Sequence, residues 1–567
     1  MALTLVSDEL LLLINNVWIL LVSFAVAVIA ASIALLVPYS WASLRPRNFP
    51  PGPKPLPFIG NLNLIPPSKA FTLFHEWTKQ YGPIIGLKFG PANVVILNNW
   101  KDVQELLEKR GNIYSSRPPN YIANTLICPN NTHILFTPYN NAWKSLRKAV
   151  QALFTPRQLA VIAPIQEAEA TQTIFDILRE PEKYYEHIQR YTTAVILASV
   201  FGQRGERFDA PNVQALYDVQ NRFTALLEPG AAPPVDGFPS LRYLPEVLAP
   251  WKRRAREIQR DQRALYFRLY DATKERMRKG IRTGCFMEKL IDEQEKNKLD
   301  DEHTAYLGGN LMEAGSDTTS SMLLSFLLAV LENPDALRKA QADVDRVCGA
   351  ERSPNMHDLE DLPYIEACMH EVWPVSFIHN LYKVSLILSL QVLRWRPVAA
   401  GGIPHMLTQQ DTYKNYVFPA GTMFFANTWA ISHDESEYDA PNIFNPDRWL
   451  DGNKFGTKAS ATMDMDAGEQ RKTSYGWGAG RRICSGQKMA EVSLKINIAK
   501  MVWAFDIQRD EGQGKQVDVS VKTGYEGGFL VCPKRFPVKI KPRGKVYEDV
   551  IRREFEALEG FYASLAA

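Results

Sequence analysis

The sequence predicts a mainly α-helical protein with a smaller β region, preceded by one N-terminal membrane-spanning helix. Residues 17–37 carry no charge, helical periodicity dominates from about Asp102 to Gly349, and short strand-like runs separated by turn residues follow Pro397. With 567 residues and 46% hydrophobic content, the chain is long enough for one large domain or two ordinary ones.

The uncharged run Val17–Val37 has the length that a helix needs to cross a bilayer. No lysine or arginine precedes it, whereas a cleaved signal peptide begins with a basic region. Arg45 and Arg47 follow it, so the positive-inside rule leaves the bulk of the chain in the cytosol. A buried core helix is the alternative, but we interpret residues 1–40 as a membrane anchor.

The chain after the anchor divides into a hinge, one large domain and a tail. Residues 41–60 include the proline-rich run "FPPGPKPLPFIG", which predicts a stiff, extended connector. The runs "PIIGLKFG" and "ANVVILNN" predict a small sheet, and Thr304–Glu332 predicts one long helix. We assign residues 61–545 to the domain and residues 546–567 to a tail that could form an amphipathic surface helix.

Charge and cysteine content exclude several classes of protein. The net charge of +3 is close to balanced and the basic residues form no long block, which argues against nucleic acid as a partner. The six cysteines form no C-x-x-C pair. This spacing argues against a zinc site or a disulfide framework and favours a reducing compartment.

The run "WGAGRRICSG", Trp477–Gly486, carries the strongest chemical signal. Its glycines allow a tight turn, and Cys484 stands where a helix begins, so the helix dipole favours a thiolate there. Arg481 and Arg482 add positive charge. A thiolate held in this way can be the axial ligand of a haem iron. An inert buried cysteine is the alternative for any cysteine in isolation.

On this loop the sequence resembles the cytochrome P450 family of haem-thiolate monooxygenases, and motifs of that family recur from about residue 50 to residue 540. Trp477 stands where the family more often has phenylalanine, and Ser485 where it more often has proline. The resemblance implies the cytochrome P450 fold, a triangular prism of helices around haem b, with the iron held by Cys484.

A second motif, "EAGSDTTSS", spans Glu313–Ser321 in the predicted long helix. Ala314 and Gly315 are small and leave room beside a flat cofactor, while Asp317 and Thr318 form an adjacent acid and alcohol that can relay protons. A helix with a few small polar residues is the alternative for this run alone. The resemblance implies that it is the oxygen-activation motif, with Asp317 and Thr318 as the catalytic pair.

Four further residues match positions that bind the haem propionates in the family. Trp143 and Arg147, in "AWKSLRK", share one helical face, although an ordinary amphipathic turn has the same spacing. Arg482 is a third candidate because a guanidinium suits a carboxylate. His405, in "GGIPH", occupies a place where the family often has another propionate-binding residue.

The resemblance also implies a structural triad, formed by a glutamate and an arginine at i and i+3 of one helix and an arginine from a later loop. Arg448 in "FNPDRW" matches the loop member. Glu371 and Arg394 match the helix members, but Val372–Gln391 stands between them. Removing that segment restores the spacing and the helical phase.

We interpret residues 372–391 as a retained intron that has been translated. Every valine codon begins with GT, and the glutamine codon CAG ends with AG, so the segment can run in frame from GT to AG. The alternative is a genuine loop that leaves Glu371 and Arg394 adjacent in space. The segment, however, is apolar and poor in turn residues, unlike a solvated insertion. With it in place we expect poor folding or poor haem loading.

The resemblance implies a monooxygenase on the cytosolic face of the endoplasmic reticulum membrane, acting on a lipophilic small molecule. No dinucleotide fingerprint follows a predicted strand, so electrons would come from an NADPH-dependent reductase. A basic docking face including Lys144, Lys148 and Lys488 is our hypothesis for that partner. Similarity to filamentous-fungal members favours secondary metabolism and a small phenolic or polyketide-derived aromatic substrate.

Two other classes stay open: a haem-thiolate enzyme that rearranges its substrate without external electrons, and a product made inactive by the insertion. The Asp317–Thr318 pair argues against the first. The segments expected to form a substrate pocket are largely apolar, with Glu526 as the one candidate charge anchor. They are residues 117–130, 228–245, 311–318, 398–403 and 525–528.

Overall fold

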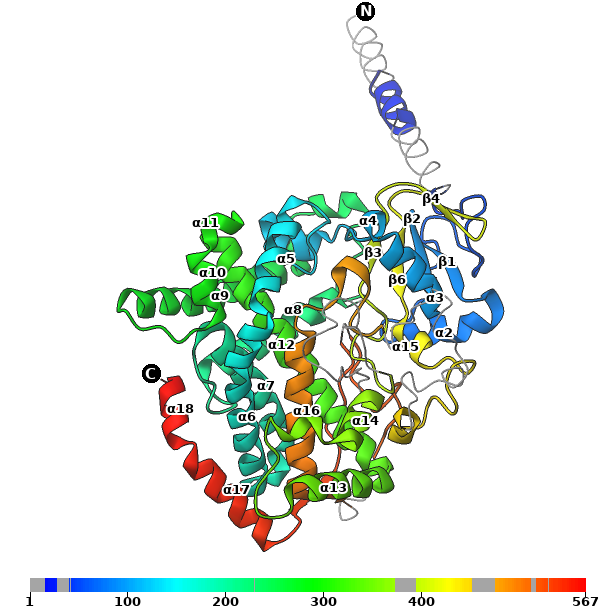
Figure 1. Ribbon diagram of the computed structural model, residues 1–567. Coiled ribbons are helices and arrows are strands. Elements are labelled where there is room, and N and C mark those ends of the chain that lie inside the picture. Colours follow the sequence, from blue (N-terminus) through cyan, green and yellow to red (C-terminus); the bar gives the residue numbers. More distant parts are fainter. Residues whose placement is uncertain are drawn as a thin grey trace, which may run out of the picture.

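The computed structural model describes residues 16–27, 40, 42–228, 230–372, 394–450, 475–510, 517–528 and 530–566. For residues 370–372 and 566 it describes the backbone alone. Most of the suspected insertion, residues 373–391, therefore lies outside the described residues. Helices make up most of the molecule and a small sheet lies at one side of it (Figure 1), which confirms the predicted mainly α-helical class.

The helices carry the labels of Figure 1, except the first, which is unlabelled. In chain order they are Asn16–Ala27, α2 (Ala70–Tyr81), α3 (Trp100–Val103), α4 (Gly111–Tyr114), α5 (Asn141–Leu153), α6 (Pro156–Arg179), α7 (Tyr184–Phe201), α8 (Pro211–Leu227), α9 (Pro250–Arg278), α10 (Phe286–Asp292), α11 (Gln294–Asn297), α12 (Asp301–Glu332), α13 (Pro334–Cys348), α14 (Pro363–Val372), α15 (Thr428–Ser432), α16 (Gln487–Ala504), α17 (Lys545–Ala557) and α18 (Glu559–Ala566).

The strands form one four-stranded sheet and two two-stranded ribbons among the described residues. They are β1 (Ile84–Phe89), β2 (Ala92–Leu97), β3 (His405–Met406), β4 (Asp411–Tyr413), β5 (Tyr416–Phe418), β6 (Met423–Ala426), β7 (Phe505–Arg509) and β8 (Val538–Pro542). The sheet order is β1-β2-β6-β3, in which β2 and β6 are parallel and the other pairs antiparallel. The two runs predicted as strands are β1 and β2.

Helix α12 is the element on which the site is built. Asp300 caps its start by accepting a hydrogen bond from the backbone N–H of His303 at 2.8 Å, and Pro334 follows its end. Gly315 allows α7 to approach closely, because a Cβ atom there would lie 2.8 Å from Cδ1 of Ile196. The long helix predicted for Thr304–Glu332 is thus confirmed, and its position against α7 depends on a glycine.

Among the described helices, α12 alone is long and apolar enough to cross a membrane, and 78% of its apolar window is buried within the protein. It is therefore a core helix. Asn16–Ala27 is apolar but shorter than a membrane span. The rest of the predicted span, residues 28–37, lies outside the described residues.

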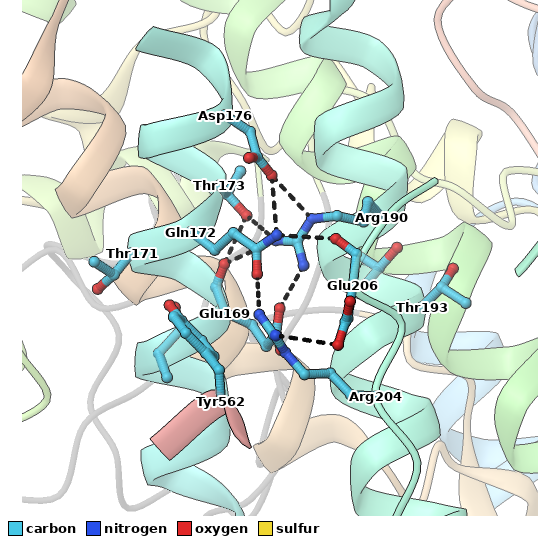
Figure 2. Close-up of polar contacts among 12 residues, drawn as sticks. Glu169, Thr171, Gln172, Thr173, Asp176, Arg190, Thr193, Arg204, Glu206 and Tyr562 are labelled. Carbon is cyan, nitrogen blue, oxygen red and sulfur yellow. Dashed lines mark hydrogen bonds and ion pairs between the residues drawn. The ribbon is translucent and has the colours of Figure 1, made fainter. Parts of the chain in front are cut away.

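The C-terminal tail forms two helices, α17 and α18, that run along α6 over a buried ion-pair network (Figures 1 and 2). Glu169 of α6 is fully buried and accepts hydrogen bonds from Arg190 and, at 3.1 Å, from Nε of Arg204. The ring of Tyr562 lies 3.9 Å from the Arg204 guanidinium, and its hydroxyl donates to the carbonyl of Ala168 at 2.7 Å. The tail is thus packed against the domain rather than lying free on its surface.

Candidate active site

The loop that carries Cys484 is held in a tight turn before α16. The N–H of Cys484 donates to the carbonyl of Trp477 at 2.9 Å. Gly478 and Gly480 have φ angles of 81° and 58°, and a Cβ atom on Gly480 would lie 2.0 Å from the carbonyl oxygen of Leu107. Glycine is therefore required at position 480, both for its conformation and for the close approach of the neighbouring backbone.

Cys484 lines a cavity in the protein. Burial raises the pKa of its thiol, while the N–H groups of Gly486 and Gln487 and the charge of Arg147 lower that pKa. The loop and the helix start thus act in the expected direction, towards the thiolate, although the net direction of the pKa shift is upward. Desolvation outweighs the helix N-terminus, and a metal cation at the sulfur would reverse the balance by removing the thiol proton.

The cavity has a volume of about 390 Å³, and all five predicted cofactor-binding residues are in its lining. Trp143, Arg147, Arg482, His405 and Cys484 all line it. They come from α5, the cysteine loop and β3, which are remote from one another in sequence. The structure thus brings this predicted set together around one space.

Arg482 is held by three backbone carbonyls and an aromatic ring. Its guanidinium donates to the carbonyls of Ser115 at 2.8 Å, Thr137 at 2.7 Å and Ile134 at 3.3 Å, and lies 4.2 Å from the ring of Trp143. These contacts fix its orientation but leave its charge unneutralised, because none of the partners is acidic.

Arg117 is a further cavity-lining arginine, which the sequence reasoning missed. It is 5% exposed and donates to the carbonyls of Leu135 at 3.0 Å, Ile403 at 3.1 Å and Pro404 at 2.5 Å. The loop beginning at residue 117 was expected at the pocket. No local pattern in "SSRPPN" distinguishes its arginine from an exposed one, because its neighbours come from distant segments.

These arginines form a cationic cluster suited to a ligand with carboxylate groups. Within the described part of the chain, Arg117, Arg147 and Arg482 bond to backbone carbonyls rather than to acidic side chains, and the Nε of Arg147 is buried without a partner. Burial lowers the pKa of Arg482 to about 8 and that of Arg117 to about 9. Two propionates beside Cys484 would neutralise this charge, so the residues present fit haem b.

His405 also lines the cavity, and its imidazole is neutral. Its Nδ1 is 2.9 Å from the carbonyl of Tyr114, and burial, with the charges of Arg117 and Arg482, lowers its pKa well below the ordinary value. A neutral imidazole bonded through Nδ1–H keeps Nε2 as an acceptor. His405 can therefore serve a propionate only in its protonated form, which a bound carboxylate would favour.

The predicted catalytic pair is divided between the cavity wall and the interior. Thr318 lines the cavity with Ala314, whose carbonyl accepts a hydrogen bond from the Thr318 hydroxyl at 2.7 Å. Asp317 does not line the cavity. Burial and the charge of Glu313 raise the pKa of Asp317 to about 7. An acid with this pKa exchanges protons near neutral pH, which suits a proton relay to the adjacent threonine.

Glu313, which lies in the predicted pocket segment 311–318, is a second polar group in the cavity wall, and its partners are not predicted by the sequence. The carboxylate of Glu313 accepts hydrogen bonds from Gln262 at 2.8 Å, from Tyr266, and from His133, whose Nε2 lies 3.1 Å away. Glu313 and His133 line the cavity. Because α9, α12 and the loop at residue 133 supply these groups, no local sequence pattern identifies them.

The two described members of the predicted structural triad lie together. Arg394 is 1% exposed and donates to the carbonyl of Ile443 at 3.1 Å, and Arg448 approaches the same carbonyl at 3.5 Å. Helix α14, which ends with Glu371 and Val372, packs against the turn Pro446–Trp449. The side chain of Glu371 lies outside the described residues.

The pocket segments expected from the sequence are correct only in part. The cavity includes Arg117 and residues of 311–318 and 398–403, but none of the described residues of 228–245 or 525–528, and not Glu526. In their place, residues 133–136 and the part of α8 from Gln220 to Leu227 line it. The difference arises because α8 and the loop at 133–136 fold over α12, which periodicity cannot predict.

Comparisons with known proteins identify the family and the fold. The sequence profile described as "Cytochrome P450" matches residues 50–373 and 391–540. In solved structures, two zebra fish cytochrome P450 chains, one with abiraterone and one with progesterone, superpose with TM-scores of 0.64 and 0.66. Each is covered completely, spans 84% of this chain and is 22% or 23% identical to it, which supports the fold.

Similar proteins are found in fungi. The chain is 35% identical to the cytochrome P450 monooxygenase yanC of Aspergillus niger, over 90% of this chain and 93% of that protein. It is 35% identical to macC of Penicillium terrestre, over 93% and 97%, and 33% identical to patI of Aspergillus clavatus, over 95% and 98%. The chain therefore belongs to the cytochrome P450 family and is a P450 monooxygenase.

Proposed function

We propose that this monooxygenase uses haem b to insert one oxygen atom from O₂ into a lipophilic small molecule of fungal secondary metabolism. The observation that carries the proposal is that one cavity is lined by Cys484, Thr318 and a cluster of arginines that have no acidic partner among the described residues. The fungal sources of the similar monooxygenases support the metabolic assignment. A small phenolic or polyketide-derived aromatic remains our prediction for the substrate.

The residues of the site would bind the iron, bind the propionates or supply protons. Cys484 would hold the iron of the haem, whose reactivity with oxygen a thiolate ligand enhances. Arg117, Arg147 and Arg482, with Trp143 and His405, would hold the propionates and so orient the ring. Asp317 would supply protons through the hydroxyl of Thr318.

We propose the endoplasmic reticulum membrane as the location, with the domain in the cytosol beside its reductase. The described helix Asn16–Ala27 supports this, because Leu20 and Phe24 on it are about 70% exposed. Apolar side chains that protrude in this way lose free energy in water and gain it in lipid. The reductase, which binds NADPH, would supply the electrons.

We also propose that the working enzyme lacks residues 372–391. The family match stops at residue 373 and resumes at residue 391, which supports an insertion that the family does not share. Arg394 and Arg448 already converge on Ile443. Without the insertion, Glu371 would stand one helical turn from Arg394, where its carboxylate can pair with both guanidiniums.

The test is the carbon-monoxide difference spectrum of the dithionite-reduced protein, recorded for the full chain and for a chain without residues 372–391. We expect the band of a thiolate-ligated haem, strongest in the shortened chain. Equal bands would make the segment a tolerated loop. The absence of a band in both chains would refute the proposed function, and a Cys484→Ser variant supplies the baseline.

A second measurement distinguishes oxygen insertion from rearrangement. We expect product formation to require both NADPH and the reductase. Product that forms at the same rate without the reductase would instead identify the electron-independent class of haem-thiolate enzyme.

A further inference from the structure

Two amide side chains in the wall of the cavity carry polar atoms that have no partner among the described residues. They are Asn310 of α12 and Gln220 of α8, each 4% exposed. The unpartnered atoms are Nδ2 of Asn310 and Oε1 of Gln220. Both residues line the same cavity as Cys484. A buried polar atom without a hydrogen bond is destabilising, so each of these atoms calls for an explanation.

The orientation of the Asn310 amide follows from its fixed contact. The backbone N–H of Ile134 lies 3.0 Å from Oδ1 of Asn310. A backbone N–H can only donate, so the atom facing it must be the amide oxygen. The NH₂ group therefore points elsewhere, and Asn310 keeps a hydrogen-bond donor without a described partner in the wall of the cavity.

The orientation of the Gln220 amide is also fixed, but here the NH₂ group, not the oxygen, has the partner. Its Nε2 lies 3.1 Å from the backbone carbonyl oxygen of Glu313. A carbonyl oxygen can only accept, so the atom facing it must be the NH₂ group. The amide oxygen is the atom left over, and Gln220 keeps a hydrogen-bond acceptor without a described partner in the wall of the cavity.

The neighbouring polar groups already have hydrogen-bond partners of their own. The carboxylate of Glu313 already receives hydrogen bonds from Gln262, Tyr266 and His133. Both ring nitrogens of His133 are engaged, Nε2 by Glu313 and Nδ1 by the N–H of Leu135 at 3.3 Å. Around them the wall is apolar, because the His133 ring packs against two phenylalanine rings.

We propose that Asn310 and Gln220 form a subsite for an uncharged hydroxyl group of the substrate. The hydroxyl oxygen accepts from Nδ2 of Asn310, and its hydrogen is donated to Oε1 of Gln220. A carboxylate is disfavoured because it would face the Gln220 oxygen, and an ammonium because it would face the Asn310 NH₂ group. The inference rests on the proposed function and narrows its substrate class to neutral, lipophilic molecules with a hydroxyl group.

The test measures binding of three matched probes to the haem-loaded protein by the ligand-induced shift of its Soret band. 2-Naphthol can donate and accept, 2-methoxynaphthalene can only accept, and naphthalene can do neither. We expect the wild-type protein to bind 2-naphthol most tightly and naphthalene least tightly, with each hydrogen bond contributing about 3- to 10-fold.

Two substitutions separate the two contacts. In Gln220→Met the acceptor is lost, so 2-naphthol should bind about 3- to 10-fold less tightly and match 2-methoxynaphthalene. In Asn310→Leu the donor is lost, so both oxygen-containing probes should weaken while naphthalene does not. Thr224→Val is the matched control: Thr224 lines the same cavity, but its hydroxyl bonds to the backbone carbonyl of Gln220 at 2.9 Å.

The carbon-monoxide band is recorded first for every variant, so that failure of the subsite is distinguished from failure of the proposed function. Its absence from the wild-type protein, in both chain lengths, refutes the function. A normal band with equal affinity for the three probes, or with no binding of any, overturns the subsite alone. A preference for 2-naphthol that survives both substitutions also overturns it, and assigns Asn310 and Gln220 to ordered water.

Discussion

Arg394 and Arg448 donate hydrogen bonds to one carbonyl oxygen, that of Ile443, at 3.1 and 3.5 Å. Two guanidiniums at one carbonyl repel each other, by an amount that is on the order of a few kcal/mol in a partly buried site. A carboxylate beside them converts that repulsion into attraction. The position of Glu371 at the end of α14, which packs against the turn of Arg448, suits this role.

Replacing Arg394 with alanine should abolish most of the haem-loaded protein. Arg394 also donates to the carbonyls of Ser432 at 3.3 Å and Pro441 at 2.6 Å, and each buried carbonyl left without a donor costs about 1–3 kcal/mol. We expect the carbon-monoxide band per milligram of polypeptide to fall about tenfold or more. Arg338→Ala, at an exposed ion pair with Asp335, should leave the band unchanged. Equal yields from both variants would contradict the prediction.

Arg117→Ala should accelerate the loss of haem. A hydrogen bond to a charged group contributes about 1.5–3 kcal/mol, so haem transfer to apomyoglobin should become about 10- to 100-fold faster. Arg117→Lys, which keeps the charge but loses the two-pronged geometry, should lie between that variant and the wild type. Arg481→Ala is the control, because Arg481 is exposed, bonds to Asn112 and does not line the cavity. Similar rates for Arg117→Ala and Arg481→Ala would exclude Arg117 from the cluster.

The pH dependence of turnover should report Asp317. With its pKa raised to about 7, Asp317 holds a proton below pH 7 and loses it above, whereas an ordinary aspartate is ionised throughout this range. If protonated Asp317 supplies the protons that the reaction in the cavity needs, kcat should fall as the pH rises through about 7. Asp317→Asn should lower kcat and remove this pH dependence while retaining the carbon-monoxide band.

The adjacent hydroxyl supplies a second check on the same relay. Thr318→Val should lower coupled turnover because it removes the hydroxyl from the cavity wall, whereas Thr318→Ser should restore most of it. A pH profile that keeps its fall near pH 7 in Asp317→Asn would assign that fall to another group.

The tail should stabilise the domain through Tyr562, whose ring covers the guanidinium of Arg204 (Figure 2). Tyr562→Phe loses one hydrogen bond, about 1 kcal/mol, and Tyr562→Ala also loses the buried ring, about 3–5 kcal/mol. The carbon-monoxide band is lost on heating, and we expect the temperature of this loss to fall slightly in Tyr562→Phe and clearly in Tyr562→Ala. Ser564→Ala, at an exposed site of α18, should not change it. Identical temperatures for all three would make the tail dispensable.

Reversal of charge on α5 should slow electron delivery. Lys144 and Lys148 are exposed, on the helix whose Arg147 contacts the cysteine loop through the carbonyl of Ile483 at 2.6 Å. We expect Lys144→Glu and Lys148→Glu to slow haem reduction by the reductase, most strongly at low ionic strength, and to leave the dithionite-reduced spectrum unchanged. Lys79→Glu on α2, beside the sheet in Figure 1, is the matched control. Lys488 is less suitable for this test because it pairs with Glu491 at 3.2 Å.

Local sequence identified the parts of the site that consecutive residues build. The Cys484 loop was predicted because its glycines, arginines and following helix lie within a short run, and its turn depends on Gly478 and Gly480 as expected. The long helix followed from periodicity. The net direction of the Cys484 pKa shift could not be predicted in this way. Desolvation of the thiol outweighs the effect of the helix N-terminus, and desolvation depends on the whole fold.

The sequence by itself thus determined the family and the mainly α-helical class. It also determined the cysteine expected to bind iron and the long helix expected to carry the proton-relay residues. Only the tertiary structure decided that Arg117 joins the cationic cluster and that Asn310 and Gln220 keep a donor and an acceptor without partners among the described residues. The physical reason is that a local motif fixes backbone geometry over a few residues. Charge compensation and hydrogen-bond satisfaction, by contrast, depend on segments that only folding brings into contact.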